Sequence, residues 1–93
     1  MTYRIFESDH FHKELKKTLS PVQQEMVLER LSTRIYPQLR KEPHYGLQIK
    51  KLKGYTPETW RYRIGNLRFF YSMDEEKKVV VMTAVRFRKD AYR

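Results

Sequence analysis

The sequence predicts an α+β fold in which two N-terminal helices pack on one face of a small antiparallel sheet, in the order β-α-α-β-β-β. Two observations carry this prediction. Residues 11–35 contain apolar side chains about four positions apart, which is typical of helices with one buried face. Residues 48–85 contain short alternating or β-branched runs separated by turn residues, which is typical of strands joined by short connections.

The first strand and the first helix are predicted at the N-terminus. Residues 2–6 (TYRIF) form a short β candidate, and Ser8 or Asp9 can cap the helix that follows. This helix carries an apolar stripe with a spacing of four residues: Phe11, Leu15 and Leu19. We interpret the stripe as part of the core.

The second helix has a clear start signal. Ser20 can act as the cap, Pro21 suits the first turn, and Gln23 can return the hydrogen bond of a capping box. The side chains expected on its buried side are Val22, Met26, Leu28, Leu31 and Ile35. Pro37 and Pro43 are expected to end this helix and to bound a polar loop.

Three further strand regions follow the helices. A strand is predicted within residues 48–53 (QIKKLK), and the turn-rich residues 54–59 separate it from residues 60–71 (WRYRIGNLRFFY). The charged loop 74–78 then leads into the β-branched run 79–85 (VVVMTAV).

Residues 60–71 predict a hairpin that turns at residues 65 and 66, a Gly-Asn pair. A two-residue turn places Arg63 opposite Arg68, and Arg61 opposite Phe70, on one face. The other face is apolar and can pack on the helices: Trp60, Tyr62, Ile64, Leu67, Phe69 and Tyr71. Since like charges directly opposite each other destabilise a sheet, the arginines suggest that a phosphate lies between them. The alternative is a solvated outer face that is basic without a ligand.

Composition narrows the class of protein. The 93 residues fit a single domain, 1–93, and the net charge of +9 with a pI near 9.9 attracts phosphate backbones, anionic membrane surfaces or acidic proteins. Nucleic acid is the leading candidate. No apolar run approaches the ~20 residues that span a bilayer, and the N-terminal residues lack the basic segment and apolar stretch that are typical of an export signal. We therefore expect a soluble, cytoplasmic protein without a membrane partner.

No cofactor is expected. The chain has no cysteine, which excludes disulfides, thiolate metal sites and a cysteine nucleophile and permits a reducing cytoplasm. His10 and His12 are two residues apart, so on a helix they point in different directions and cannot hold one metal together. Gly54 and Gly65 are turn residues and not parts of a nucleotide-binding loop. We expect neither a metal nor a small-molecule cofactor.

The order of these features resembles the RelE/ParE toxin superfamily of toxin–antitoxin systems. The resemblance covers nearly the whole chain and includes the helix at 11–19, the turn at 52–54, the hairpin at 60–71 and the ending RFRKDAY at 86–92. Members similar to RelE are ribosome-dependent endoribonucleases that cut mRNA in the ribosomal A site without a metal. The resemblance implies an mRNA interferase whose partners are mRNA on the 70S ribosome, ribosomal RNA and a cognate antitoxin protein.

The resemblance also implies roles for individual residues. The catalytic positions of the RelE pattern fall on Arg61, Arg63, Arg68, Arg86 and Tyr92. RelE itself has lysines where this chain has Arg61 and Arg63. Because an arginine stays protonated and is a poor general base, this departure leaves the proton acceptor open. Tyr92 is a candidate for proton transfer or for stacking on a base. The side chains expected to contact RNA are Lys50, Lys51, Lys53, Arg88 and Phe70.

Two other functions remain open. A ParE-like protein would share the fold and inhibit DNA gyrase, although the retained Arg68, Arg86 and Tyr92 argue against it. A noncatalytic basic RNA-binding module would use the same arginines with aromatic side chains as stacking surfaces.

Overall fold

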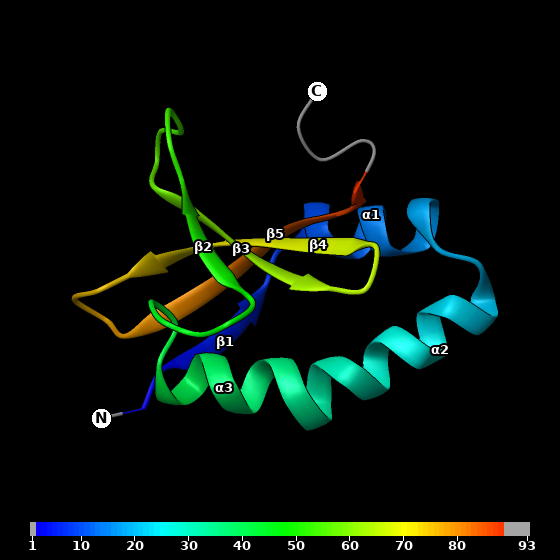
Figure 1. The fold of residues 1–93 in the computed structure, drawn as a ribbon, viewed down its shortest axis with the longest axis horizontal. Helices are drawn as coiled ribbons and strands as arrows, with labels where there is room; N and C mark the ends of the chain where they lie inside the picture. The colour runs from blue at the N-terminus through cyan, green and yellow to red at the C-terminus, as the bar shows by residue number, and fades with distance from the viewer. Residues whose placement is uncertain (1, 89–93) are drawn as a thin grey trace.

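One five-stranded sheet runs through the computed structural model, which describes residues 2–88 (Figure 1). Its strands are β1 (Arg4–Glu7), β2 (Ile49–Leu52), β3 (Thr59–Ile64), β4 (Leu67–Asp74) and β5 (Val79–Phe87), in the order β1-β5-β4-β3-β2. The predicted α+β class is confirmed. The sheet differs from the prediction in two ways. Within residues 2–88 four strands follow the helices where three were expected, and the sheet is mixed and not antiparallel, because β1 pairs with β5 in parallel while the other pairs are antiparallel. A long connection separates β1 from β5, so no tight turn forces them into antiparallel pairing.

Both helix starts are those that the sequence predicts. Helix α1 (Asp9–Thr18) begins after Ser8, whose hydroxyl accepts a hydrogen bond from the backbone N–H of Phe11 at 3.1 Å. Helix α2 (Pro21–Arg30) begins after Ser20 with a complete capping box formed with Gln23. These contacts satisfy N–H groups that a helix start otherwise leaves without partners.

The prediction that Pro37 ends the second helix is wrong. The helical run continues from α2 through the π-helical turn η1 (Leu31–Ile35) into α3 (Tyr36–Lys41). Proline has no N–H, and in an ordinary α-helix its ring collides with the carbonyl four residues earlier. The wider turn avoids this conflict, since the N–H of Tyr36 bonds five residues back to the carbonyl of Leu31. The helix ends just before Pro43, as predicted.

The predicted buried side of the second helix is also partly wrong. Val22, Met26 and Leu28 are 69%, 53% and 55% exposed. The buried stripe comprises Val27, Leu31, Ile35 and Leu39. The helical run is longer than expected, and the buried residues of its second half are four positions apart. The same spacing continues back to Val27, so Val22, Met26 and Leu28 lie off the buried face.

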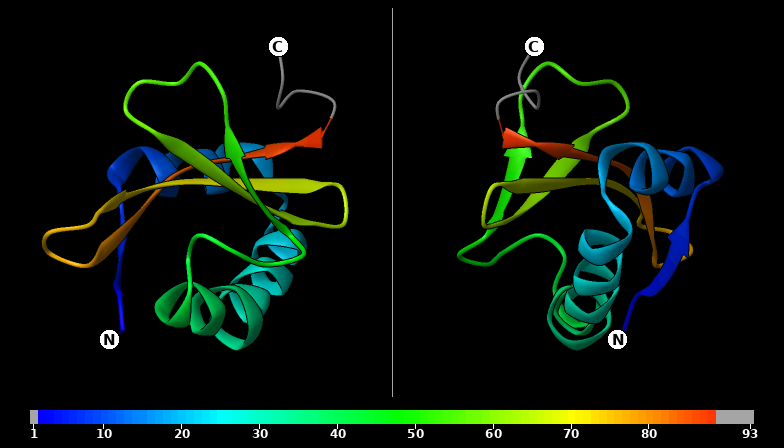
Figure 2. Two further views of the ribbon diagram at one scale, coloured as in Figure 1. Left: turned by 60° about the vertical axis from the view of Figure 1, so that its left-hand side comes forward. Right: turned by 90° about the vertical axis from the view of Figure 1, so that its right-hand side faces the viewer.

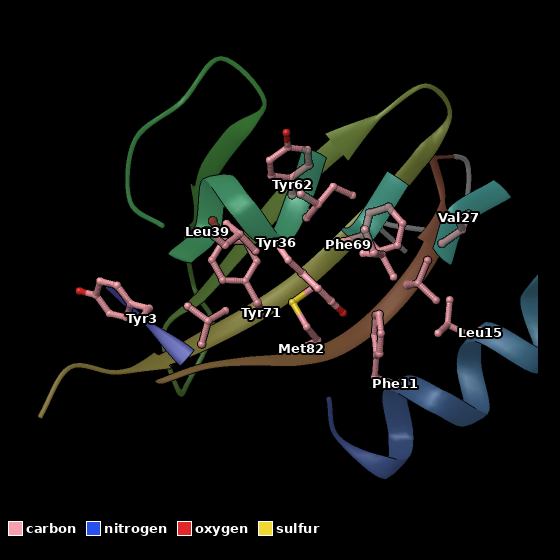
Figure 3. Close-up of a cluster of buried hydrophobic side chains, with 14 of the residues drawn as sticks. Tyr3, Phe11, Leu15, Val27, Tyr36, Leu39, Tyr62, Phe69, Tyr71 and Met82 are labelled. Carbon is pink, nitrogen blue, oxygen red and sulfur yellow. The ribbon is translucent and has the colours of Figure 1, made fainter. Parts of the chain in front are cut away.

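The main core lies between the helices and one face of the sheet (Figures 2 and 3). Phe11 and Leu15 enter it from α1, and Phe69 and Tyr71 enter it from β4. The Tyr71 hydroxyl donates a hydrogen bond to the carbonyl of Pro43 at 2.7 Å and so ties the loop after α3 to the sheet. No helix within residues 2–88 is long and apolar enough to cross a membrane.

A β-bulge in β5 decides which side chains reach the open face. The register shifts between Phe70 and Tyr71, so that these residues pair with Ala84 and Met82 and Thr83 is left between them. The Thr83 hydroxyl donates to the carbonyl of Phe70 at 3.1 Å. The extra residue shifts the alternation of side chains along β5. Met82, before the bulge, and Val85, after it, are therefore both fully buried in the main core.

Candidate functional site

The face of the sheet opposite the main core carries two lateral rows of side chains. In the first row Arg63 pairs with Arg68, and Arg68 pairs with Arg86, so β3, β4 and β5 each contribute one arginine. We call these three residues the arginine row. The predicted hairpin register is thereby confirmed. Three cations in register repel one another, and an anion bound between them would relieve this repulsion.

The second row lies beside the arginine row. Lys50 pairs with Arg61, Arg61 pairs with Phe70, and Phe70 pairs with Ala84, so the row crosses all four antiparallel strands. Phe70, Ala84 and Leu52 form a small apolar cluster of their own. This cluster gives the open face a hydrophobic floor next to its cations.

Gln48 holds the two arginines of β3. Its carbonyl accepts from Arg61 Nη1 at 3.2 Å and from the backbone N–H of Arg63 at 2.9 Å. Its side-chain oxygen lies 3.5 Å from Arg63 Nε. Gln48 immediately precedes β2, so the start of this strand orients the side chains of Arg61 and Arg63 on β3.

Arg68 is the buried member of the arginine row, at 3% exposed. Its Nη1 donates to the carbonyls of Gly65 and Leu67, at 3.3 and 3.1 Å, and its Nε has no hydrogen-bond partner among residues 2–88. In this arrangement Arg68 supports the hairpin turn and supplies charge from below the surface. A ligand would therefore contact mainly the exposed side chains of Arg63 and Arg86.

Arg86 lies beside a cleft of about 270 Å³ and its side chain is 44% exposed. Phe70 and Ala84 line the cleft from the sheet, and His10 lines it from α1. Glu14, also on α1, places Oε1 3.7 Å from Arg86 Nε. This carboxylate holds Arg86 at the edge of the cleft.

The other predicted RNA contacts lie in different environments. Lys50 and Lys53 are exposed, whereas Lys51 points away from the arginines and contacts Glu58 at 2.9 Å. Phe70 is 6% exposed, so it offers little ring surface for stacking. Arg88 is exposed beyond β5 and its N–H bonds to the carbonyl of Asn66 at 2.7 Å. Tyr92 lies outside the described residues.

Sequence reasoning missed the contribution of α1 to this site. His10 and Glu14 were assigned no role, yet both lie beside Arg86. The signal that could have found them is their spacing of four residues, which places them on one side of a helix. Nothing in the sequence placed that side next to β5.

Of three comparisons with known proteins, the one with solved structures found matches. No family model matches the chain, and no curated protein matches it. Among solved structures, the chain is similar to an archaeal RelE–RelB complex from Pyrococcus horikoshii at 26% identity and a TM-score of 0.68, with 98% of this chain and all of that chain covered.

Two bacterial structures are also similar. The RelBE2 toxin–antitoxin complex of Mycobacterium tuberculosis matches at 23% identity and a TM-score of 0.71, covering 95% of this chain and all of that one. A mutant of the Escherichia coli toxin RelE in the free state matches at 22% identity and a TM-score of 0.66, covering 99% and 88%. The chain therefore has the RelE-like fold and resembles the RelE-like toxin superfamily over almost its entire length.

Proposed function

We propose that this protein is the toxin of a toxin–antitoxin pair and acts in the cytoplasm, as a single domain, as a ribosome-dependent mRNA endoribonuclease. The observation that carries the proposal is the arginine row, in which Arg63, Arg68 and Arg86 stand in register on the open face. A protein with a net charge of +9 has no folding reason to concentrate three cations in one row. An RNA phosphate is the anion that such a row suits.

The proposed reaction is the attack of a ribose 2′-hydroxyl on the adjacent phosphate, which leaves a 2′,3′-cyclic phosphate and a 5′-hydroxyl. Negative charge grows on the phosphoryl oxygens in the transition state, and a fixed arginine beside them can contribute about 3 kcal/mol. Arg86 is well suited to this role, because it lies beside a cleft and is held by Glu14. Arg61 and Arg63 would orient the phosphate, Arg68 would add charge from below, and Tyr92 would stack or transfer a proton.

The ribosome is the proposed docking partner that completes the site. Lys50, Lys53 and Arg88 are exposed around the arginine row and would contact ribosomal RNA, and Lys51 would add a contact from the other face of β2. Contacts of this kind release counterions, so binding should weaken steeply as salt rises. The arginines alone do not provide a general acid and a general base. Cleavage would therefore depend on the ribosome to hold the RNA in the reactive geometry.

The second proposed partner is an acidic antitoxin. The similar structures from Pyrococcus horikoshii and Mycobacterium tuberculosis are complexes of a toxin with its antitoxin. In this chain a groove of about 230 Å³ lies between α2 and the hairpin turn, with the half-exposed Met26 on its wall. Strand β1 also ends the sheet and leaves one edge unpaired within the described residues. An antitoxin segment that lies in the groove or along β1 would bury apolar surface and neutralise charge.

Mapping of mRNA ends tests this function. Purified protein is incubated with a defined mRNA, alone and on 70S ribosomes stalled with a known codon in the A site. We expect cuts within that codon only when ribosomes are present, and loss of cutting when the antitoxin is added. Binding to ribosomes without cuts would favour a noncatalytic module, and inhibition of gyrase supercoiling without cuts would favour the ParE-like alternative.

A further inference from the structure

The proposed reaction needs a group that accepts the proton of the 2′-hydroxyl, and the arginine row cannot supply it. An arginine stays protonated at any pH where the ribosome works. The hairpin tyrosines do not serve either. Tyr62 and Tyr71 lie on the core side, and burial raises the pKa of both hydroxyls. Apart from Tyr92, which lies outside the described residues, the acceptor has to come from another element that reaches the cleft.

Helix α1 brings an imidazole to the cleft. β1 pairs with β5 only as far as Met82, so among residues 2–88 no strand pairs with this edge of the later half of β5, and α1 packs along the strand. His10 thereby reaches the cleft wall that also contains Arg86, while its side chain stays 66% exposed and open to a substrate. An imidazole is the side chain most often used to transfer protons in catalysis.

Glu14 links the imidazole to the arginine row. Its Oε1 lies 3.5 Å from His10 Nε2 and 3.7 Å from Arg86 Nε, and its side chain is only 17% exposed. The same oxygen is buried and forms no hydrogen bond among residues 2–88. A buried carboxylate oxygen without a hydrogen bond is costly, and a small movement of either neighbour would satisfy it.

On this basis we propose that His10 is the proton acceptor of the site and that Glu14 is its positioning residue; this inference rests on the proposed ribonuclease function. A carboxylate next to Nε2 favours the tautomer with its proton on Nε2, which leaves the Nδ1 lone pair for the substrate. Among residues 2–88, the charged or titratable groups that line the cleft or contact the imidazole are Glu14 on α1, Arg86 on β5 and Tyr55 in the loop before β3.

The step balances without a cofactor. The 2′-oxygen forms a bond to phosphorus and its proton passes to Nδ1 of His10. The bond between phosphorus and the 5′-oxygen breaks, the leaving oxygen takes a proton from water, and the hydroxide that remains takes the proton back from the His10 imidazolium. Arg86 stabilises the charge on the phosphoryl oxygens, and the Glu14 carboxylate stabilises the imidazolium that forms.

The test compares His10→Ala with His12→Ala on ribosomes, under single-turnover conditions from pH 5.5 to 8.5. His12 is a matched control, since it is an exposed histidine on the same helix that instead approaches Glu7 at 3.3 Å. Positioned general bases contribute roughly 100- to 10,000-fold to a rate, and we expect His10→Ala to lose a factor in this range. Wild type and His12→Ala should slow as the pH falls, and His10→Ala should lack this dependence.

Two further measurements separate proton transfer from a structural role. Added imidazole should restore cleavage by His10→Ala, because the vacated position borders an open cleft, and the melting temperature of this variant should stay near that of wild type. The role of His10 would be overturned if His10→Ala cleaves within twofold of the wild-type rate, or if its rate still falls at low pH as that of wild type does. Either result would leave the proposed function standing. Absence of cleavage by wild type and His12→Ala alike would overturn both.

Discussion

The arginine row should cost the protein stability, and removing one of its members should recover part of that cost. Arg63 is the suitable member, since it is exposed and has a single in-register cation, Arg68. A like-charged cross-strand pair is unfavourable by about 0.2–1 kcal/mol. Within residues 2–88, the side-chain hydrogen bond that Arg63→Thr loses is the 3.5 Å contact of Nε with Gln48, which is at the limit of a hydrogen bond. The expected net stabilisation is about 0.5 kcal/mol at low salt.

Thermal unfolding measures this gain directly. For a domain of this size 1 kcal/mol shifts the melting temperature by about 4–8 °C, so the variant should melt about 2–4 °C above wild type in dilute buffer. The difference should shrink at 1 M NaCl, where the screening length falls to about 3 Å. Threonine also suits a strand better than arginine does, and Arg4→Thr on β1, opposite Val79, controls for this effect.

The same substitution should weaken the proposed activity. Loss of one arginine that orients the phosphate should slow cleavage on ribosomes by about 100-fold, while Arg4→Thr should cleave at the wild-type rate. A variant that melts below wild type at low salt, or whose melting difference is the same at both salt concentrations, would refute the view that the row is under repulsion.

Two other substitutions test the core and the pH dependence. Tyr71→Phe leaves the carbonyl of Pro43 without its donor and should lower the free energy of unfolding in urea by about 1–2 kcal/mol, whereas no change would mean that water replaces this bond. Partial burial acts to lower the pKa of His44, but hydrogen bonds and charges from Glu42 and Glu75 outweigh it and raise this pKa. His44 therefore stabilises the fold fully below about pH 6.5 and loses this contribution as the pH rises through its raised pKa. In urea titrations His44→Gln should thus be more destabilised relative to wild type at pH 6 than at pH 8.5, and an equal difference at both would contradict the assignment.

The hairpin could be predicted from sequence because its signals are local. A Gly-Asn turn fixes the register, and alternation then decides the face of each side chain, which is why the positions of Arg63 and Arg68 were predicted correctly. The helix starts are local signals of the same kind, since Ser8 and Ser20 bond within their own first turns.

The features that sequence reasoning missed depend on contacts between distant residues. Pro37 stays inside a helical run because a π-helical turn before it removes the clash, and no residue pattern announces such a turn. The bulge at Thr83 is one extra residue in the run 79–85 (VVVMTAV), which has no alternation of polar and apolar residues that could reveal it. The packing of α1 along β5, which brings His10 to Arg86, is likewise set by tertiary contacts and not by spacing.

The rate of A-site cleavage by Arg86→Ala, with ribosomes saturating, tests the central claim most directly. Arg86 is partly exposed at the edge of the cleft, so its truncation should leave the melting temperature nearly unchanged. We expect a rate at least about 100-fold below wild type, since one fixed donor to a phosphoryl oxygen is lost, and a wild-type rate for the distant control Arg4→Ala. An Arg86→Ala protein that is folded and cleaves within threefold of wild type would contradict the claim that the arginine row is the reaction site.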